Sequence, residues 1–159
     1  MSRPKDIGTT AETAVVRYLA AHGWPAAERR ALTGALDCGD VSGTPGICWE
    51  VKGGRTAETV GDGLLGDWLE ETERERLNAG ADLGILVTKR TGYGPARAAS
   101  WWAHVDMVTW MSLCRGRIPL ADTLFSEPVR MRLSALVPLL HAAGYGTPST
   151  AVPAVEVVA

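Results

Sequence analysis

An alternating run of side chains at residues 47–52 constrains the fold more than any other feature of the chain. The run reads Ile-Cys-Trp-Glu-Val-Lys, and a turn-forming Gly-Thr-Pro-Gly segment separates it from Asp40. Side chains of a strand point alternately to opposite faces, so the run has an apolar row and a polar row. These rows are Ile47, Trp49 and Val51 on one face and Cys48, Glu50 and Lys52 on the other. We therefore expect a β-hairpin over residues 40–52, with the apolar row on a core and a carboxylate and an ammonium converging on the other face.

The acid that joins Glu50 on this polar face depends on the register of the hairpin. A turn around Thr44 places Asp40 opposite Cys48, and therefore on the same face as Glu50. The same register places Asp37 on the other face. Because a shift of one residue would exchange the two acids, Asp40 is the favoured candidate and Asp37 stays an alternative.

An acid followed by Glu-x-Lys on the next strand resembles the PD-(D/E)XK nuclease superfamily, in particular its Holliday-junction-resolvase-like branch. The matching residues are Asp40, Glu50 and Lys52, and the resemblance extends over residues 8–110, with Gly39 where the family has proline. It implies a restriction-endonuclease-like fold, a mixed β-sheet flanked by helices on both faces. It also implies a metal-dependent endonuclease that hydrolyses DNA phosphodiester bonds, at branched or Holliday-junction DNA if the branch assignment holds.

The resemblance also implies a role for each matching residue. Asp40 and Glu50 would bind Mg²⁺, which Mn²⁺ can replace, because hard cations take oxygen ligands. The carbonyl oxygen of Val51 would be a third ligand. Lys52 would position or deprotonate the attacking water and offset the phosphate charge. The alternative interpretation is an exposed strand face that carries an ordinary Glu/Lys pair.

Glu12 matches the first motif of the same family, on an expected helix that ends at Gly23. Thr9 and Glu12 also fit a capping box, which would start the helix at residue 9. Glu12 lies at helical spacing from an apolar stripe that contains Val15 and Leu19, so it faces the edge of the core. A carboxylate there needs a cation or a metal-bound water, and both roles stay open.

The remaining pattern predicts a mixed α/β fold. We expect helices over residues 67–78 and 129–143, strands over residues 83–88 and 105–110, and either a mobile loop or the start of a helix over residues 55–66. The charged helix at residues 67–78 is typical of a solvated face, with Arg74 and Arg76 as weak candidates for the site. Residues 1–145 form one domain in this interpretation, and residues 146–159 form a disordered tail.

Charge and cysteine content limit the partners and the compartment. The net charge of −2 provides no general basic surface for DNA, so binding requires a local strip. Lys89, Arg90 and Arg97 follow a strand and lie in a Gly-rich loop, where they are candidate phosphate contacts or ordinary strand-end charges. Three cysteines without Cys-x-x-Cys spacing are typical of a reducing cytosol, and no apolar run is long enough for a membrane span. We expect a cytoplasmic protein.

Two further expectations concern assembly and activity. A two-fold symmetric junction is cut best by two active sites in one symmetric dimer, so we expect a homodimer. The alternative function is a catalytically inactive nuclease-fold protein that binds DNA or serves in assembly. In a third interpretation the Glu-x-Lys pattern is accidental in an α/β interaction protein.

Overall fold

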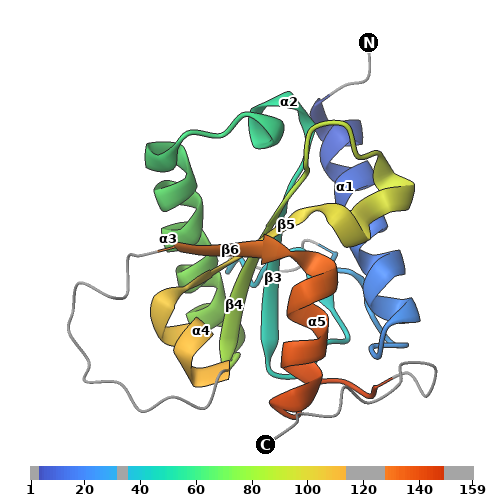
Figure 1. The fold of residues 1–159 in the computed structure, drawn as a ribbon, viewed down its shortest axis with the longest axis vertical. Coiled ribbons are helices and arrows are strands. Elements are labelled where there is room, and N and C mark those ends of the chain that lie inside the picture. The colour runs from blue at the N-terminus through green and yellow to red at the C-terminus, as the bar shows by residue number, and fades with distance from the viewer. Residues whose placement is uncertain (1–3, 32–35, 114–127, 149–159) are drawn as a thin grey trace, which may run out of the picture.

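A computed structural model of the protein describes residues 4–31, 36–113 and 128–148 (Figure 1). In chain order the elements are α1 (Pro4–Ala21), β1 (Glu28–Arg29), β2 (Val41–Ser42), β3 (Ile47–Lys52), α2 (Gly54–Glu58), α3 (Asp62–Ala79), β4 (Leu83–Thr88), the 3-10 helix η1 (Pro95–Ser100), β5 (Trp102–Asp106), α4 (Met107–Leu113), β6 (Pro128–Arg132) and α5 (Leu133–Ala142). None of the helices within these ranges is long and apolar enough to cross a lipid bilayer.

Four strands form one mixed sheet in the order β3-β4-β5-β6. β3 and β4 are parallel, whereas the β4–β5 and β5–β6 pairs are antiparallel. Parallel neighbours need a crossover connection, and α3 provides it between β3 and β4. β1 and β2 pair separately as a short antiparallel ribbon, which the amide of Asp40 joins to β3 by donating to the carbonyl of Trp49.

Helices cover both faces of the sheet, which confirms the expected mixed α/β class. Figure 1 shows α3 on one side of β3 and β4, with α1 and α5 on the other. The α1 and α5 side holds the apolar core, which includes the predicted row Ile47, Trp49 and Val51. On the α3 side, a methyl group built on Gly84 of β4 would lie 3.3 Å from Thr72, so the helix packs closely on the strand.

In the first half of the chain, one prediction is wrong and one open alternative is decided. α1 begins at Pro4, not at residue 9, so Thr9 lies inside the helix and its carbonyl accepts a hydrogen bond from the Thr13 hydroxyl. The capping box is therefore absent. For residues 55–66 the helical alternative is the one observed: the segment contains most of α2 and the first turn of α3, in which Ala57 and Leu65 are buried.

Two predictions about the second half need similar correction. The strand expected over residues 105–110 is β5, which ends at Asp106. The Asp106 carboxylate accepts hydrogen bonds from the amide and the hydroxyl of Thr109, which is how an aspartate starts a helix, and α4 follows. The helix expected over residues 129–143 begins only at Leu133, because the preceding residues alternate between the two faces of the sheet as β6.

The first residues of the expected tail lie against the body. The Thr147 amide donates to the Gly23 carbonyl at 2.8 Å. Gly146 has a φ of +68°, and a side chain there would meet the Trp24 ring at 2.6 Å. Residues 149–159 of that tail lie outside the described residues.

Candidate functional site

Asp40 reaches β3 by a route that differs from the expected one. Its amide donates to the Trp49 carbonyl at 2.7 Å, so it does not stand opposite Cys48, and the predicted register is wrong. Its carboxylate instead lies along the β3 backbone, where Oδ2 accepts the Val51 amide at 2.8 Å. Gly39 makes this approach possible: its φ is +85°, and a Cβ there would lie 2.7 Å from Cys48 Sγ. Proline, with a fixed negative φ, is incompatible with this turn.

Glu50 and Lys52 lie on the face of β3 that α3 covers, as strand parity predicts. The Glu50 side chain is only 9 % exposed, and its Oε1 lies 2.5 Å from Lys52 Nζ. Repulsion by Glu50 is one of the causes that raise the pKa of Asp40, so these two acids lie close together. The structure therefore brings Asp40, Glu50 and Lys52 to one place, as expected, although the register argument for Asp40 is wrong.

Helix α3 adds two acids that the sequence interpretation missed. Carboxylate oxygens of Glu50, Glu71 and Glu75 all lie within 4.8 Å of one another. Glu71 accepts a hydrogen bond from Lys52 at 2.7 Å. Glu75 is 3 % exposed, and its Oε2 has no hydrogen-bond partner within the described part of the chain.

A helical stripe in the sequence would have indicated Glu75. Leu65, Trp68, Thr72 and Glu75 recur at the spacing of one helix face, and all but Trp68 are buried. Glu75 stands in that stripe at a position where an apolar residue is usual. The predicted solvated face holds for Glu70, Glu73 and Arg74, which are exposed. Arg76 pairs with Glu73 and donates to the Ala81 carbonyl, away from the cluster.

We call Asp40, Glu50, Glu71, Glu75 and Lys52 the carboxylate cluster. Burial raises the pKa of Asp40 to about 8, and repulsion by Glu50 adds to this. Burial likewise raises the pKa of Glu50 to about 7, against the opposing effect of Lys52. The pKa of Glu75 is raised to about 7, mainly by burial. Burial lowers the pKa of Lys52, but its hydrogen bonds to Glu50 and Glu71 outweigh this and raise it above 10.5.

These shifts have a common physical meaning. Burial is the main reason why Asp40, Glu50 and Glu75 hold their protons, and a shortage of positive charge adds to it, because Lys52 is the one ammonium within the cluster. A divalent cation would relieve the same shortage. The oxygen-only donor set suits Mg²⁺, and the unsatisfied Oε2 of Glu75 gives an independent reason to place positive charge here.

The other predicted site residues lie around this cluster. Glu12 of α1 is close enough to contribute to the raised pKa of Asp40, but its direct partner is Arg29 of β1, at 2.6 Å. The Asp37 carboxylate accepts the Gly39 amide within its own loop. Val51 contacts Asp40 through its amide; its carbonyl as a metal ligand stays a prediction.

The three predicted phosphate contacts differ from one another. The Lys89 ammonium forms an ion pair with Glu58 of α2, and its backbone amide donates to the Lys52 carbonyl. Arg90 and Arg97 both lie over the ring of Tyr93. Lys89 is thus already neutralised, whereas the two arginines make aromatic contacts.

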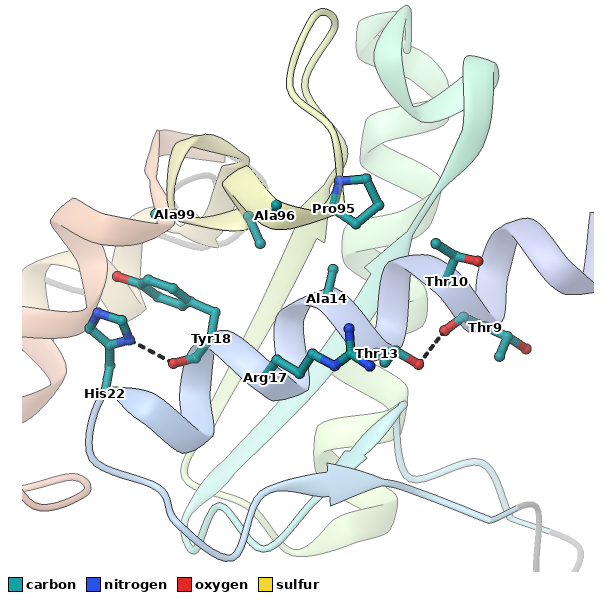
Figure 2. Close-up of a pocket in the computed structure, with 11 residues that line it drawn as sticks. Thr9, Thr10, Thr13, Ala14, Arg17, Tyr18, His22, Pro95, Ala96 and Ala99 are labelled. Carbon is teal, nitrogen blue, oxygen red and sulfur yellow. Dashed lines mark hydrogen bonds between the residues drawn. The ribbon is translucent and has the colours of Figure 1, made fainter.

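A separate open groove of about 900 Å³ lies between α1 and η1 (Figure 2). Figure 2 shows Arg17, Tyr18 and His22 of the α1 side opposite Pro95, Ala96 and Ala99. No member of the carboxylate cluster lines this groove. Comparison with protein-family models, curated proteins and solved structures found no match for the chain. What the site can do therefore follows from the chemistry of its own residues.

Proposed function

We propose that this protein is a Mg²⁺-dependent endonuclease of PD-(D/E)XK type that hydrolyses DNA phosphodiester bonds. The observation that carries the proposal is the convergence of Asp40, Glu50 and Lys52. Asp40 is held on the β3 backbone at 2.8 Å, and Lys52 lies 2.5 Å from Glu50. An accidental Glu-x-Lys pair on a solvated strand would have no reason to be buried beside an acid from the segment that precedes β2.

The donor set supports a metal requirement. Mg²⁺ is usually bound by one or two carboxylates, with waters and substrate phosphate oxygens as the other ligands. Asp40 and Glu50 would supply the carboxylates, and Glu75 lies within reach of Glu50 to bind the cation directly or through a water. When bound, Mg²⁺ would neutralise phosphate charge and lower the pKa of a coordinated water.

The chain's own residues supply the other requirements of hydrolysis. Lys52 has three donors, of which Glu50 and Glu71 engage two in the structure. Its raised pKa keeps it charged at neutral pH, so it can donate to a phosphate oxygen or orient a water. Because it stays protonated, its role here is positioning and charge compensation, not proton abstraction. Burial raises the pKa values of Asp40 and Glu50 in the metal-free protein, and a bound cation would favour their carboxylate forms as ligands.

The topology supports the finer fold assignment that the resemblance implies. α1 brings Glu12 beside Asp40, β3 carries Glu50 and Lys52, and the α3 crossover leads to a parallel β4. This is the order of a helix, a strand pair and a crossover in a restriction-endonuclease-like core. A homodimer with two such sites would suit a two-fold symmetric DNA junction, which is the substrate that the resolvase-like branch implies.

A cleavage assay tests the proposal. End-labelled duplex, flap, single-stranded and four-way-junction DNA is incubated with the protein in Mg²⁺, in Mn²⁺ and in EDTA. We expect metal-dependent cutting of at least one substrate, and loss of cutting by Asp40→Asn. Glu70→Gln, which removes an exposed acid of α3, is the matched control and should cut like the wild type. If a folded wild-type protein binds DNA but cuts none of the four substrates in either metal, the protein is an inactive DNA-binding or assembly module.

A further inference from the structure

Three arginines and two aromatic rings alternate on the surface beside the carboxylate cluster. The Arg97 and Arg90 Cζ atoms lie 4.2 and 4.5 Å from the centroid of the Tyr93 ring. Arg90 and Arg130 lie 4.3 and 4.7 Å from the centroid of the Trp102 ring. We call Arg97, Tyr93, Arg90, Trp102 and Arg130 the arginine ladder. It joins the loop after β4 to η1, β5 and β6, which are distant in sequence.

The positive charge of this ladder is available to a ligand. Arg29, Lys52, Arg76 and Lys89 each pair with a carboxylate. None of the ion pairs within residues 4–31, 36–113 and 128–148 involves an arginine of the ladder. Three guanidinium groups held close together repel one another, and an anion that bridges them would remove this repulsion. The ladder is therefore suited to a polyanionic ligand.

Trp102 of the ladder lies on the same face of the sheet as Lys52. Lys52 of β3 stands opposite Thr88 of β4, and Thr88 stands opposite Trp102 of β5. Two strand spacings separate Lys52 from Trp102, which is about 10 Å. That distance corresponds to about three nucleotide rises of 3.4 Å. A strand whose phosphate lies at the carboxylate cluster would therefore reach the ladder a few nucleotides away.

We propose that the arginine ladder binds the phosphate backbone of a nucleic acid, beside the carboxylate cluster. The choice of nucleic acid among polyanions rests on the proposed function. The rings hold the guanidinium groups in place and do not stack on bases, because each ring already has two guanidinium groups against it. A guanidinium held by its plane keeps its N–H edge for a bidentate contact with phosphate. The ladder adds Arg130 to the predicted contacts and leaves Lys89 out.

The test is a binding measurement in EDTA, where the nuclease reaction is absent. Anisotropy of a labelled DNA duplex is followed as a function of salt for the wild type and for Arg90→Gln, Arg97→Gln and Arg130→Gln. Each ladder variant should reduce the magnitude of the log–log salt slope by about 0.9. Arg74→Gln removes an exposed arginine of α3 and should leave the slope unchanged. Circular dichroism melts verify that every variant is folded.

Two more arms test the role of the rings. Tyr93→Leu keeps all charges but removes a ring that holds two guanidinium groups in place. Affinity should therefore fall, while the number of released counterions stays close to that of the wild type. A single strand with abasic sites should bind as tightly as the same strand with its bases. Weaker binding of the abasic strand by the wild type but not by Tyr93→Leu would mean that Tyr93 stacks on bases, which overturns this role of the rings.

The remaining outcomes separate the ladder from the nuclease proposal. Unchanged salt slopes for all three arginine variants would overturn the ladder even if the protein cuts DNA. Ladder-dependent binding by a protein that cuts no DNA would support the ladder and refute the nuclease. Ladder-dependent binding to vesicles that contain phosphatidylserine, without binding to DNA, would refute the choice of nucleic acid.

Discussion

Replacing Glu75 with glutamine should make the metal-free protein more stable at alkaline pH. Glu75 is 3 % exposed. Burial is the main cause that raises its pKa from 4.5 to about 7. The folded state therefore binds this proton more tightly than the unfolded chain does. Below pH 4.5 both states hold the proton, so the carboxyl group costs no stability; as pH rises from 4.5 to about 7 only the unfolded chain releases the proton, so stability falls, and above about 7 the loss is complete.

The size of this effect follows from the pKa difference. One pKa unit corresponds to 1.36 kcal/mol, so the rise from 4.5 to about 7 amounts to about 3 kcal/mol. Glutamine has the same shape and no charge, so it lacks this loss. Glu75→Gln should therefore be about 3 kcal/mol more stable than the wild type at pH 8, and close to it at pH 4.5. His104, whose pKa burial lowers to about 4, has the opposite pH dependence but affects both proteins equally.

The assay is urea unfolding followed by tryptophan fluorescence, in EDTA, at a series of pH values between 4.5 and 8. Glu70→Gln on the same helix is exposed and should follow the wild type at every pH. Adding Mg²⁺ at pH 8 should stabilise the wild type by mass action, and Glu75→Gln less. A Glu75→Gln protein that is no more stable than the wild type at pH 8 would refute the electrostatic account of the cluster.

Three further predictions test how the site is built. Gly39→Ala should lower the free energy of unfolding by at least about 1 kcal/mol in urea melts, because alanine resists the φ of +85° and its Cβ would clash with Cys48; an unchanged midpoint would mean that the turn is not needed. Glu71→Gln removes a partner that raises the pKa of Lys52, so the alkaline limb of the cleavage pH profile should move to lower pH. An alkaline limb that stays in place would mean that cleavage does not depend on the charge of Lys52. A chain that ends at Tyr145 loses the hydrogen bond from Thr147 to Gly23, which is worth about 1 kcal/mol. It should therefore melt about 2–4 °C below a chain that ends at Thr147. Equal melting temperatures would show that residues 146 and 147 are dispensable.

Strand parity made part of the site predictable from sequence. Side chains of β3 alternate regardless of tertiary context, so the pairing of Glu50 with Lys52 on one face and the apolar row on the other follow from residues 47–52 alone. Strand parity does not explain why Asp40 joins them. Its carboxylate bonds to the backbone of β3, and a positive φ at Gly39 positions it.

The errors have local physical causes. Glu71 and Glu75 stand in a run of charges, and only the buried stripe of α3 distinguishes Glu75 from its solvated neighbours. Residues 129–132 were expected in a helix because their apolar residues fit both the spacing of a helix and the alternation of a strand. Pairing with β5 makes them a strand. Lys89 fits a phosphate contact by position, but it pairs with Glu58 of α2, and the sequence left open whether that segment is a loop or the start of a helix.

The most direct test of the central claim is the single-turnover cleavage rate of wild type, Glu50→Gln and Lys52→Ala on the best substrate in Mg²⁺. Both side chains point away from the apolar core, so the variants should remain folded. The account predicts that the wild type cuts and that Glu50→Gln is slower by about 100-fold or more, because a metal ligand is worth several kcal/mol in the transition state. Lys52→Ala should be impaired similarly, and Glu70→Gln should match the wild type. Cleavage by folded Glu50→Gln at the wild-type rate would contradict the account.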